Sequence, residues 1–113
     1  MINSLSLLTR RPELSHDEFV RHWLLIHAPL AHAVPGVRRY VQNHIEGERT
    51  RPDIATTEVA VDGIAELWYD DRAAMDRANA SPEAKRLHDD GALFIGGIKT
   101  FIIDEKLIIP ISG

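Results

Sequence analysis

The chain has 113 residues, of which 44% are apolar, 27% charged and 6% aromatic. This length suits one compact domain, and the composition is typical of a globular protein rather than a disordered or fibrous one. The absence of cysteine excludes disulfides, thiolate nucleophiles and Cys-ligated metal sites. A net charge of −4 argues against nucleic-acid and anionic-membrane partners, which require a positive surface.

Nothing in the sequence indicates a targeting or membrane segment. Residues 1–11 lack the pattern of a secretory signal, and no apolar run approaches the roughly twenty residues that a membrane helix needs. We therefore expect residues 1–113 to form a single cytoplasmic domain.

The first third of the chain predicts a strand followed by a helix. Residues 2–10 predict a short strand that ends before Pro12. Ser15 and Glu18 form a capping box, which starts a helix that we expect to reach about Ala33. Within this helix, one apolar stripe follows from the α-helical period, and it contains Phe19, Trp23, Ile26 and Leu30. Pro29 predicts a kink or a loosened last turn.

The remaining elements follow from alternation and caps. Residues 37–45 predict a strand with Val37, Val41 and Ile45 on one face and Tyr40, Gln42 and His44 on the other. Residues 46–62 are polar and long for a connection, which suggests a lid or a hairpin excursion. A strand over 63–69, a helix over 72–80, a second helical stretch from Ser81 towards Asp90 and a last strand over 99–109 complete the chain.

This order of elements predicts the ferredoxin-like βαββαβ fold of the α+β class, in which two helices cover one face of a four-stranded antiparallel sheet. The other face would stay bare and would carry Val37, Val41 and Ile45. Because an exposed apolar face implies a partner, we expect a homodimer joined through the open sheet faces.

Three histidines of the first predicted helix invite a test for metal binding. His22, His27 and His32 are five residues apart, which in an α-helix rotates each about 140° from the last. Such side chains cannot converge on one ion from one helix. A site shared by His27, His44 and Glu66 across elements is conceivable, but no local pattern supports it, so we expect no metal site.

Acid–base chemistry is better supported, with His27, Tyr40 and His44 as candidate catalytic residues and Gln42 as a substrate-binding one. A histidine titrates near neutral pH, and a tyrosine hydroxyl or an amide can stabilise a developing oxyanion. The alternatives stay open. His27 fits equally a hydrogen-bonded histidine at the core edge, Tyr40 an ordinary strand residue, and Gln42 and His44 solvent-facing positions.

Glu66 and two tryptophans complete the candidate set. Glu66, beside Trp68, could be a carboxylate with a raised pKa, or it could pair with Arg38 or Arg39 across the strands. Trp23 and Trp68 are candidates for substrate contact, with a place in the core as the alternative. We expect the other histidines to be surface residues: His16, His22, His32 and His88.

The combination of these residues resembles the EthD family of the dimeric α+β barrel superfamily. The matching positions are Phe19, Trp23, His27-Ala28-Pro29-Leu30, Pro35-Gly36, Tyr40-Val-Gln42-Asn-His44, Glu66-Leu-Trp68, Phe94, Phe101 and Glu105. The resemblance implies a ferredoxin-like protomer, a dimer joined through its sheets, and a pocket between sheet and helices for cofactor-free chemistry on a small molecule. The members of this family include a methylmuconolactone methylisomerase and dehydratase-like enzymes of aromatic polyketide pathways.

Residue by residue, the resemblance implies that His27 is the acid–base residue and Tyr40 the strand tyrosine of the methylisomerase. Gln42 and His44 fit the broader Tyr-x-Gln-x-His pattern. The chain departs from the methylisomerase in two places, because residues 46–62 hold no histidine and Leu67 stands where that enzyme has a cysteine.

Three functions follow as hypotheses. The first is a cofactor-free isomerase or dehydratase in which His27 moves a proton next to a carbonyl of a small oxygenated aromatic, lactone or polyketide-like molecule. The second is a non-catalytic ligand-binding accessory protein of a degradation or biosynthesis pathway. The third is a cofactor-free oxygenase or a haem-handling protein.

Overall fold

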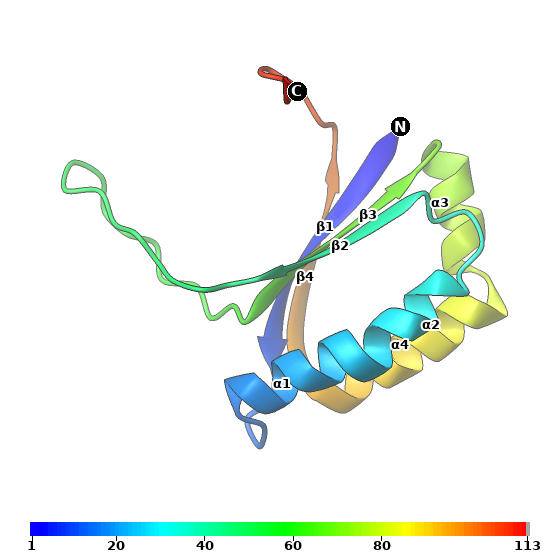
Figure 1. The fold of residues 1–113 in the computed structure, drawn as a ribbon, viewed down its shortest axis with the longest axis horizontal. Helices are drawn as coiled ribbons and strands as arrows, with labels where there is room; N and C mark the ends of the chain where they lie inside the picture. The colour runs from blue at the N-terminus through cyan, green and yellow to red at the C-terminus, as the bar shows by residue number, and fades with distance from the viewer. Residues whose placement is uncertain (113) are drawn as a thin grey trace.

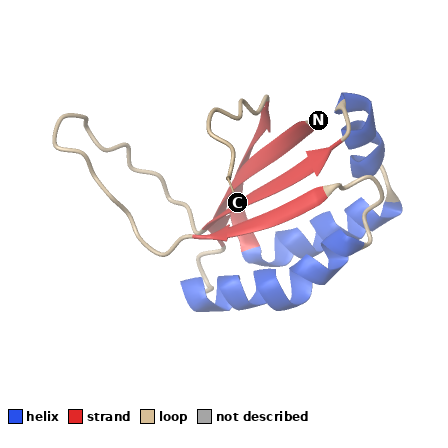
Figure 2. Ribbon diagram, turned by 45° about the horizontal axis from the view of Figure 1, so that its top comes forward, coloured by secondary structure: helices blue, strands red, loops and turns tan. Residues whose placement is uncertain are grey.

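The computed structural model describes residues 1–112, and its helices lie on one face of a single sheet (Figure 1, Figure 2). The strands are β1 (Ile2–Arg10), β2 (Arg39–His44), β3 (Gly63–Tyr69) and β4 (Ile95–Ile103). They lie in the order β2-β3-β1-β4 with every neighbouring pair antiparallel. The predicted ferredoxin-like fold of the α+β class is confirmed. Over the described residues, no helix is long and apolar enough to cross a membrane.

The helical segment after β1 changes its winding in the middle. It consists of α1 (His16–His22), a π-helical turn η1 (Trp23–His27) and α2 (Ala28–His32). The capping box is confirmed, since Ser15 Oγ accepts from the Glu18 N–H and Glu18 Oε1 accepts from the Ser15 N–H.

The π-helical turn lies directly before Pro29. Proline has no N–H to donate and its ring crowds the carbonyl one turn back, so a regular α-turn is disfavoured there. In the wider turn the Ala28 N–H donates to the Trp23 carbonyl, five residues back. The loosening that we predicted at Pro29 is thus found in the turn that precedes it.

This turn changes which residues face the sheet. The buried positions follow steps of four residues, and Phe19, Trp23, His27 and Ala31 are each at most 9% exposed. Ile26, which we placed in the apolar stripe, is 53% exposed. That prediction was wrong because the α-helical period does not hold across a π-helical turn.

Two core clusters fill the space between the sheet and the helices, which include α3 (Arg72–Asn79) and α4 (Pro82–Phe94). One cluster centres on Tyr69, Met75 and Leu87, and the other on Phe19, Trp23 and Phe94. Val37, predicted on the bare face, packs against the first cluster. The strand begins only at Arg39, so its alternation does not extend back to Val37.

The last strand begins earlier than predicted. We expected it over 99–109, whereas β4 follows α4 without a loop at Ile95 and ends at Ile103. Gly96 allows α4 to continue directly into β4, because at this position the chain passes too close to Arg10 for a side chain. A Cβ on Gly96 would lie 2.8 Å from the Arg10 carbonyl oxygen. The β1–β4 register also shifts between Thr9 and Arg10, beside this close approach.

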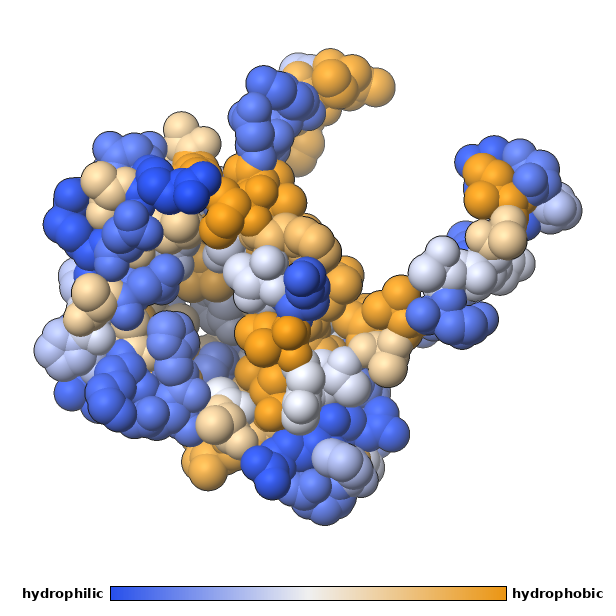
Figure 3. Space-filling view, turned by 180° about the vertical axis from the view of Figure 1, so that it is seen from behind, coloured by the Kyte–Doolittle hydropathy of each residue, from blue (hydrophilic) through white to orange (hydrophobic). Residues whose placement is uncertain are grey.

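Two arms extend away from the body, the first over residues 45–62 and the C-terminal arm over residues 104–112 (Figure 1, Figure 3). A single bridge between Arg51 and Ile54 closes the tip of the first arm, which is therefore a hairpin-like excursion. Both arms expose apolar side chains, including Ile54 at 55% and Ile109 at 84%.

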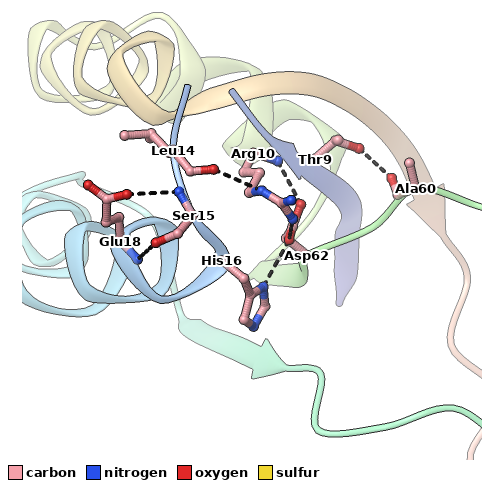
Figure 4. A network of polar contacts seen from close by, with 8 residues as sticks. All are labelled: Thr9, Arg10, Leu14, Ser15, His16, Glu18, Ala60 and Asp62. Atoms are coloured by element: carbon pink, nitrogen blue, oxygen red, sulfur yellow. Dashed lines mark hydrogen bonds and ion pairs between the residues drawn. The ribbon is translucent and has the colours of Figure 1, made fainter. Parts of the chain in front are cut away.

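A buried carboxylate anchors the base of the first arm (Figure 4). Asp62 Oδ2 accepts from the Arg10 N–H at 2.8 Å, while Oδ1 accepts from Arg10 Nη1 and His16 Nδ1, each at 2.9 Å. Burial alone would raise the pKa of Asp62, but the hydrogen bonds from Arg10 and His16 together lower it. Asp62 thus joins the end of β1, the start of α1 and the arm.

Replacing Asp62 with Asn removes a charged hydrogen-bond hub and should lower the free energy of unfolding by about 1–3 kcal/mol at neutral pH. Because the folded protein holds the Asp62 pKa below its ordinary value, this stabilisation exists at neutral pH and is lost as the pH falls through that lowered pKa. Urea unfolding of both proteins across acidic pH should show the difference shrinking. Asp53→Asn, on the exposed arm, is the control and should leave stability unchanged. A constant difference down to strongly acidic pH would contradict the assignment.

Candidate active site

A cavity of about 670 Å³ lies between the sheet and the helices, and the surface in Figure 3 is hollowed near the middle of the body. Its volume is in the range of small-molecule sites. Most of its walls are apolar, with contributions from all four strands and from η1, α3 and α4. The polar or titratable side chains that line it are Ser4, Ser6, Trp23, His27, Tyr40, Tyr69, Asn79, His88 and Thr100.

His27 is a buried imidazole in the wall of this cavity. Its side chain is 11% exposed, and its Nδ1–H donates to Asp90 Oδ2 at 2.8 Å. Because Asp90 engages Nδ1, Nε2 is the ring nitrogen free to exchange a proton with an occupant. Burial lowers the pKa of His27, and the hydrogen bond and charge of Asp90 oppose this effect without cancelling it. His27 is therefore a neutral base at neutral pH.

Asp90 also binds a second histidine. His22 Nε2–H donates to the same carboxylate at 3.0 Å, and the Phe94 ring packs against both imidazoles, with centroids 4.5 and 5.0 Å away. We expected residues five apart to point in different directions and His22 to be a surface residue. Both expectations were wrong, since the π-helical turn places His22 and His27 on one side of the helix.

Tyr40 belongs to the same cavity and is held by Gln42. The Gln42 amide Nε2 donates to the Tyr40 hydroxyl oxygen and to the Trp23 carbonyl, both at 2.9 Å. The Tyr40 O–H is left to donate elsewhere. Burial raises the pKa of Tyr40, so the hydroxyl keeps its proton at any physiological pH. Gln42 does not line the cavity, and it positions Tyr40 instead of contacting an occupant.

His44 lies behind the cavity wall rather than in it. Its ring stacks on the Trp23 indole with centroids 4.8 Å apart and planes at 16°, and its Nε2–H donates to Gln42 Oε1 at 2.9 Å. The catalytic role that we expected for His44 is therefore corrected to support of Trp23 and Gln42. Trp23 is among the residues that line the cavity, and its side chain is fully buried in the second core cluster, the place in the core given above as the alternative.

Glu66 and Trp68 lie on the opposite face of the sheet. Along β3, Ala65, Leu67 and Tyr69 line the cavity, so the residues between them face away. Glu66 Oε1 accepts from Asn43 Nδ2 at 3.2 Å, and the Arg39 guanidinium lies 4.9 Å from the Trp68 ring centroid. Neither residue lines this cavity, so the substrate-binding roles that we predicted for them here are withdrawn. The alternative that we gave for Glu66, a pair with Arg38 or Arg39, is replaced by its contact with Asn43.

Sequence reasoning missed Asp90, which is 63 residues from its hydrogen-bond partner His27. No local motif marks it, because the contact arises only when α4 packs beside η1. His16 is at the surface as predicted, with its side chain 42% exposed, but its hydrogen bond to Asp62 was not predicted. Within residues 1–112, no group of three or more His, Cys, Asp or Glu side chains has the geometry of a metal site.

Replacing Asp90 with Asn should lower the pKa of His27 further, because the carboxylate is the group that raises it against burial. An NMR pH titration of the imidazole carbon-bound protons measures this directly. Asp89→Asn is the matched control, since its neighbouring carboxylate pairs with Lys85 at the surface and should leave the titration unchanged. An unchanged or higher His27 pKa in Asp90→Asn would contradict the assigned contact.

Comparisons with known proteins identify the family of this chain. The EthD domain family matches residues 11–97. The 4-carboxymethyl-4-methylbutenolide mutase of Pseudomonas reinekei is 27% identical over 93% of this chain and 98% of its own. An EthD family protein from Bacillus halodurans is 28% identical, with a TM-score of 0.74 over 94% of this chain and 100% of its own. A dimeric ferredoxin-like protein of unknown function from Thermobifida fusca is 14% identical, with a TM-score of 0.67 over 90% and 88%. The chain belongs to the EthD family.

Proposed function

We propose that this protein is a cofactor-independent isomerase of a small, neutral carbonyl compound such as a lactone. The observation that carries the proposal is the His27–Asp90 hydrogen bond, which leaves Nε2 of a neutral, buried imidazole in the same cavity as the Tyr40 hydroxyl. The similarity to a butenolide mutase supports the isomerase class.

The chemistry follows from the two side chains. His27 Nε2 takes a proton from the carbon next to the carbonyl, and the electron pair moves onto the carbonyl oxygen as an enolate. The Tyr40 O–H stabilises that oxygen by donating to it. In a substrate with a β,γ double bond the negative charge of the enolate extends to the γ-carbon. His27 returns the proton there, so the double bond moves to the α,β position and the imidazole is neutral again.

The lining of the cavity favours a neutral substrate. No Lys or Arg among the described residues lines it, and its walls are mostly apolar. A carboxylate placed there would lose hydration without a permanent cationic partner. The P. reinekei relative is named for a carboxymethyl butenolide, so we propose that the two proteins differ in the substituent they accept.

Replacing His27 with Ala should reduce the isomerisation rate about 100-fold or more, which is the usual contribution of a positioned general base. Suitable probes are α-angelica lactone and its γ-phenyl analogue. Their conversion to the conjugated isomer in deuterated water is followed by absorbance and by deuterium uptake at the γ-carbon. Because burial lowers the His27 pKa, the acidic limb of the wild-type rate should fall below pH about 6.5.

The control is His32→Ala, which removes an exposed histidine of the same helical segment that does not line this cavity. It should keep full activity. Full activity in His27→Ala would overturn the mechanism. Binding of the lactones without turnover by the wild-type protein would instead support the ligand-binding hypothesis.

We further propose that two copies associate through the open face of the sheet. This face exposes Phe101 at 44%, beside the half-buried Leu5 that pairs with it across the strands. Val41 and Ile64 of β2 and β3 add partly buried apolar surface on the same side. An apolar face of this kind is stabilised when a second copy covers it, and the T. fusca neighbour is described as dimeric.

Replacing Phe101 with Asp places a charge in the centre of that interface and should shift the protein from dimer to monomer in sedimentation velocity. Leu25→Asp is the matched control. Leu25 is 64% exposed on the helical side of the molecule, and its replacement should leave the dimer intact. A dimer in the Phe101 variant, or a monomer in the wild type at micromolar concentration, would rule out this interface.

A further inference from the structure

The cavity is wider than His27 and Tyr40 require. Tyr40 lies on β2 at one edge of the sheet, whereas Ile98 and Ile102, which also line the cavity, lie on β4 at the other edge. The strands β3 and β1 lie between them, so the two walls are three strand spacings apart, about 14 Å. A five-membered lactone ring is much shorter, and one held at Tyr40 and His27 leaves the β4 side of the cavity unfilled.

The wall on the β4 side is apolar and uncovered. Ile98 is 62% exposed and Ile102 44%, although both line the cavity. On the neighbouring strand β1, Leu8 lines the same cavity and is only 3% exposed. Between the two isoleucines, the Thr100 hydroxyl is hydrogen bonded to the Ser6 hydroxyl across the strands at 2.8 Å. The hollow in Figure 3 is accordingly bordered by apolar surface on one side.

Gly91 of α4 keeps space open between His27 and this wall. Glycine is unfavourable within a helix, and neither backbone nor packing requires it here. Gly91 has no positive φ, and a Cβ on it would lie at ordinary contact distances, 3.5 Å from Ile95 Cδ1 and 3.7 Å from His27 Cε1. Because all three residues line the cavity, the missing side chain leaves room in the cavity beside the imidazole.

We infer that the cavity contains a β4 subsite, formed by Gly91, Ile95, Ile98 and Ile102, which binds an alkyl or aryl substituent of the substrate. This inference rests on the proposed function, which assigns the carbonyl group to Tyr40 and the reacting carbon to His27. An apolar substituent matches such walls because its binding removes apolar surface of both partners from water. The substrate class is therefore a neutral lactone or related carbonyl compound with an apolar side chain.

The test measures the binding of two saturated lactones that cannot undergo the proposed reaction. The probes are γ-valerolactone, which carries a methyl group, and γ-nonalactone, which carries a pentyl group. Each buried methylene strengthens binding by up to about 4-fold, so the wild type should bind γ-nonalactone at least about 10-fold more tightly. NMR titration of the ¹⁵N-labelled protein gives both dissociation constants and their ratio.

Two variants locate the effect. Ile98→Ser removes part of the apolar wall, and Gly91→Leu fills the space beside His27 with a residue that favours helix. Each should reduce the ratio of dissociation constants at least about 3-fold. Ile54→Ser is the matched control, because Ile54 is 55% exposed on the first arm and does not line the cavity. It should leave the ratio unchanged, which separates the subsite from unspecific binding of the longer lactone.

Similar affinity of the wild type for both lactones, or an unchanged ratio in Ile98→Ser, would overturn the inference. Loss of the dimer in Ile98→Ser with an unchanged ratio would show instead that a second copy covers this wall. The measurement does not depend on turnover. His27→Ala should therefore keep the preference for γ-nonalactone, and absence of isomerase activity in the wild type would count against the proposed function alone.

Discussion

The π-helical turn from Trp23 to His27 is the constraint on which the site depends. In a regular α-helix a spacing of five residues corresponds to about 140° of rotation, which would separate His22 from His27. The wider turn instead lets both imidazoles reach one Asp90 carboxylate. It also keeps Trp23 and His27 on the side that faces the sheet. A change of winding over a few residues thus creates both the base and the indole wall of the cavity.

This turn is stabilised by a residue from another element. The Trp23 carbonyl accepts the Ala28 N–H of the wide turn and also the Gln42 side-chain amide from β2. Gln42 has its own oxygen bound by His44 and its amide shared with Tyr40. The polar residues of β2 therefore act as one connected group, in which Tyr40 reaches the cavity while Gln42 and His44 hold it and the π-helical turn in place. Pi-helical turns are frequent at functional sites, and a dedicated support of this kind is consistent with one.

The sequence predicts the elements well where a local chemical rule sets them. The capping box at Ser15, the alternation over residues 39–44 of β2 and the order of strands and helices depend on residues close together in the chain, and these predictions were confirmed. The π-helical turn, by contrast, depends on Pro29 and on the tertiary bond from Gln42, so the α-helical period misplaced Ile26. Asp90 could not be found, because its role exists only through packing of helices far apart in sequence. The early start of β4 depends likewise on the close approach of Gly96 to Arg10, a contact that no local pattern shows.

The two roles of β3 explain why residue type alone misassigned Glu66. A strand places successive side chains on opposite faces, so one segment serves the cavity through Ala65 and Leu67 and the open face through Glu66. On the open face, the Asn43 amide meets the carboxylate and no arginine is required. On the cavity side, small and apolar residues leave room and exclude charge, which makes the few polar groups there more effective. The imidazole of His27, held by Asp90, and the hydroxyl of Tyr40 lie in such surroundings, where a polar atom of a ligand would interact with them more strongly than in water.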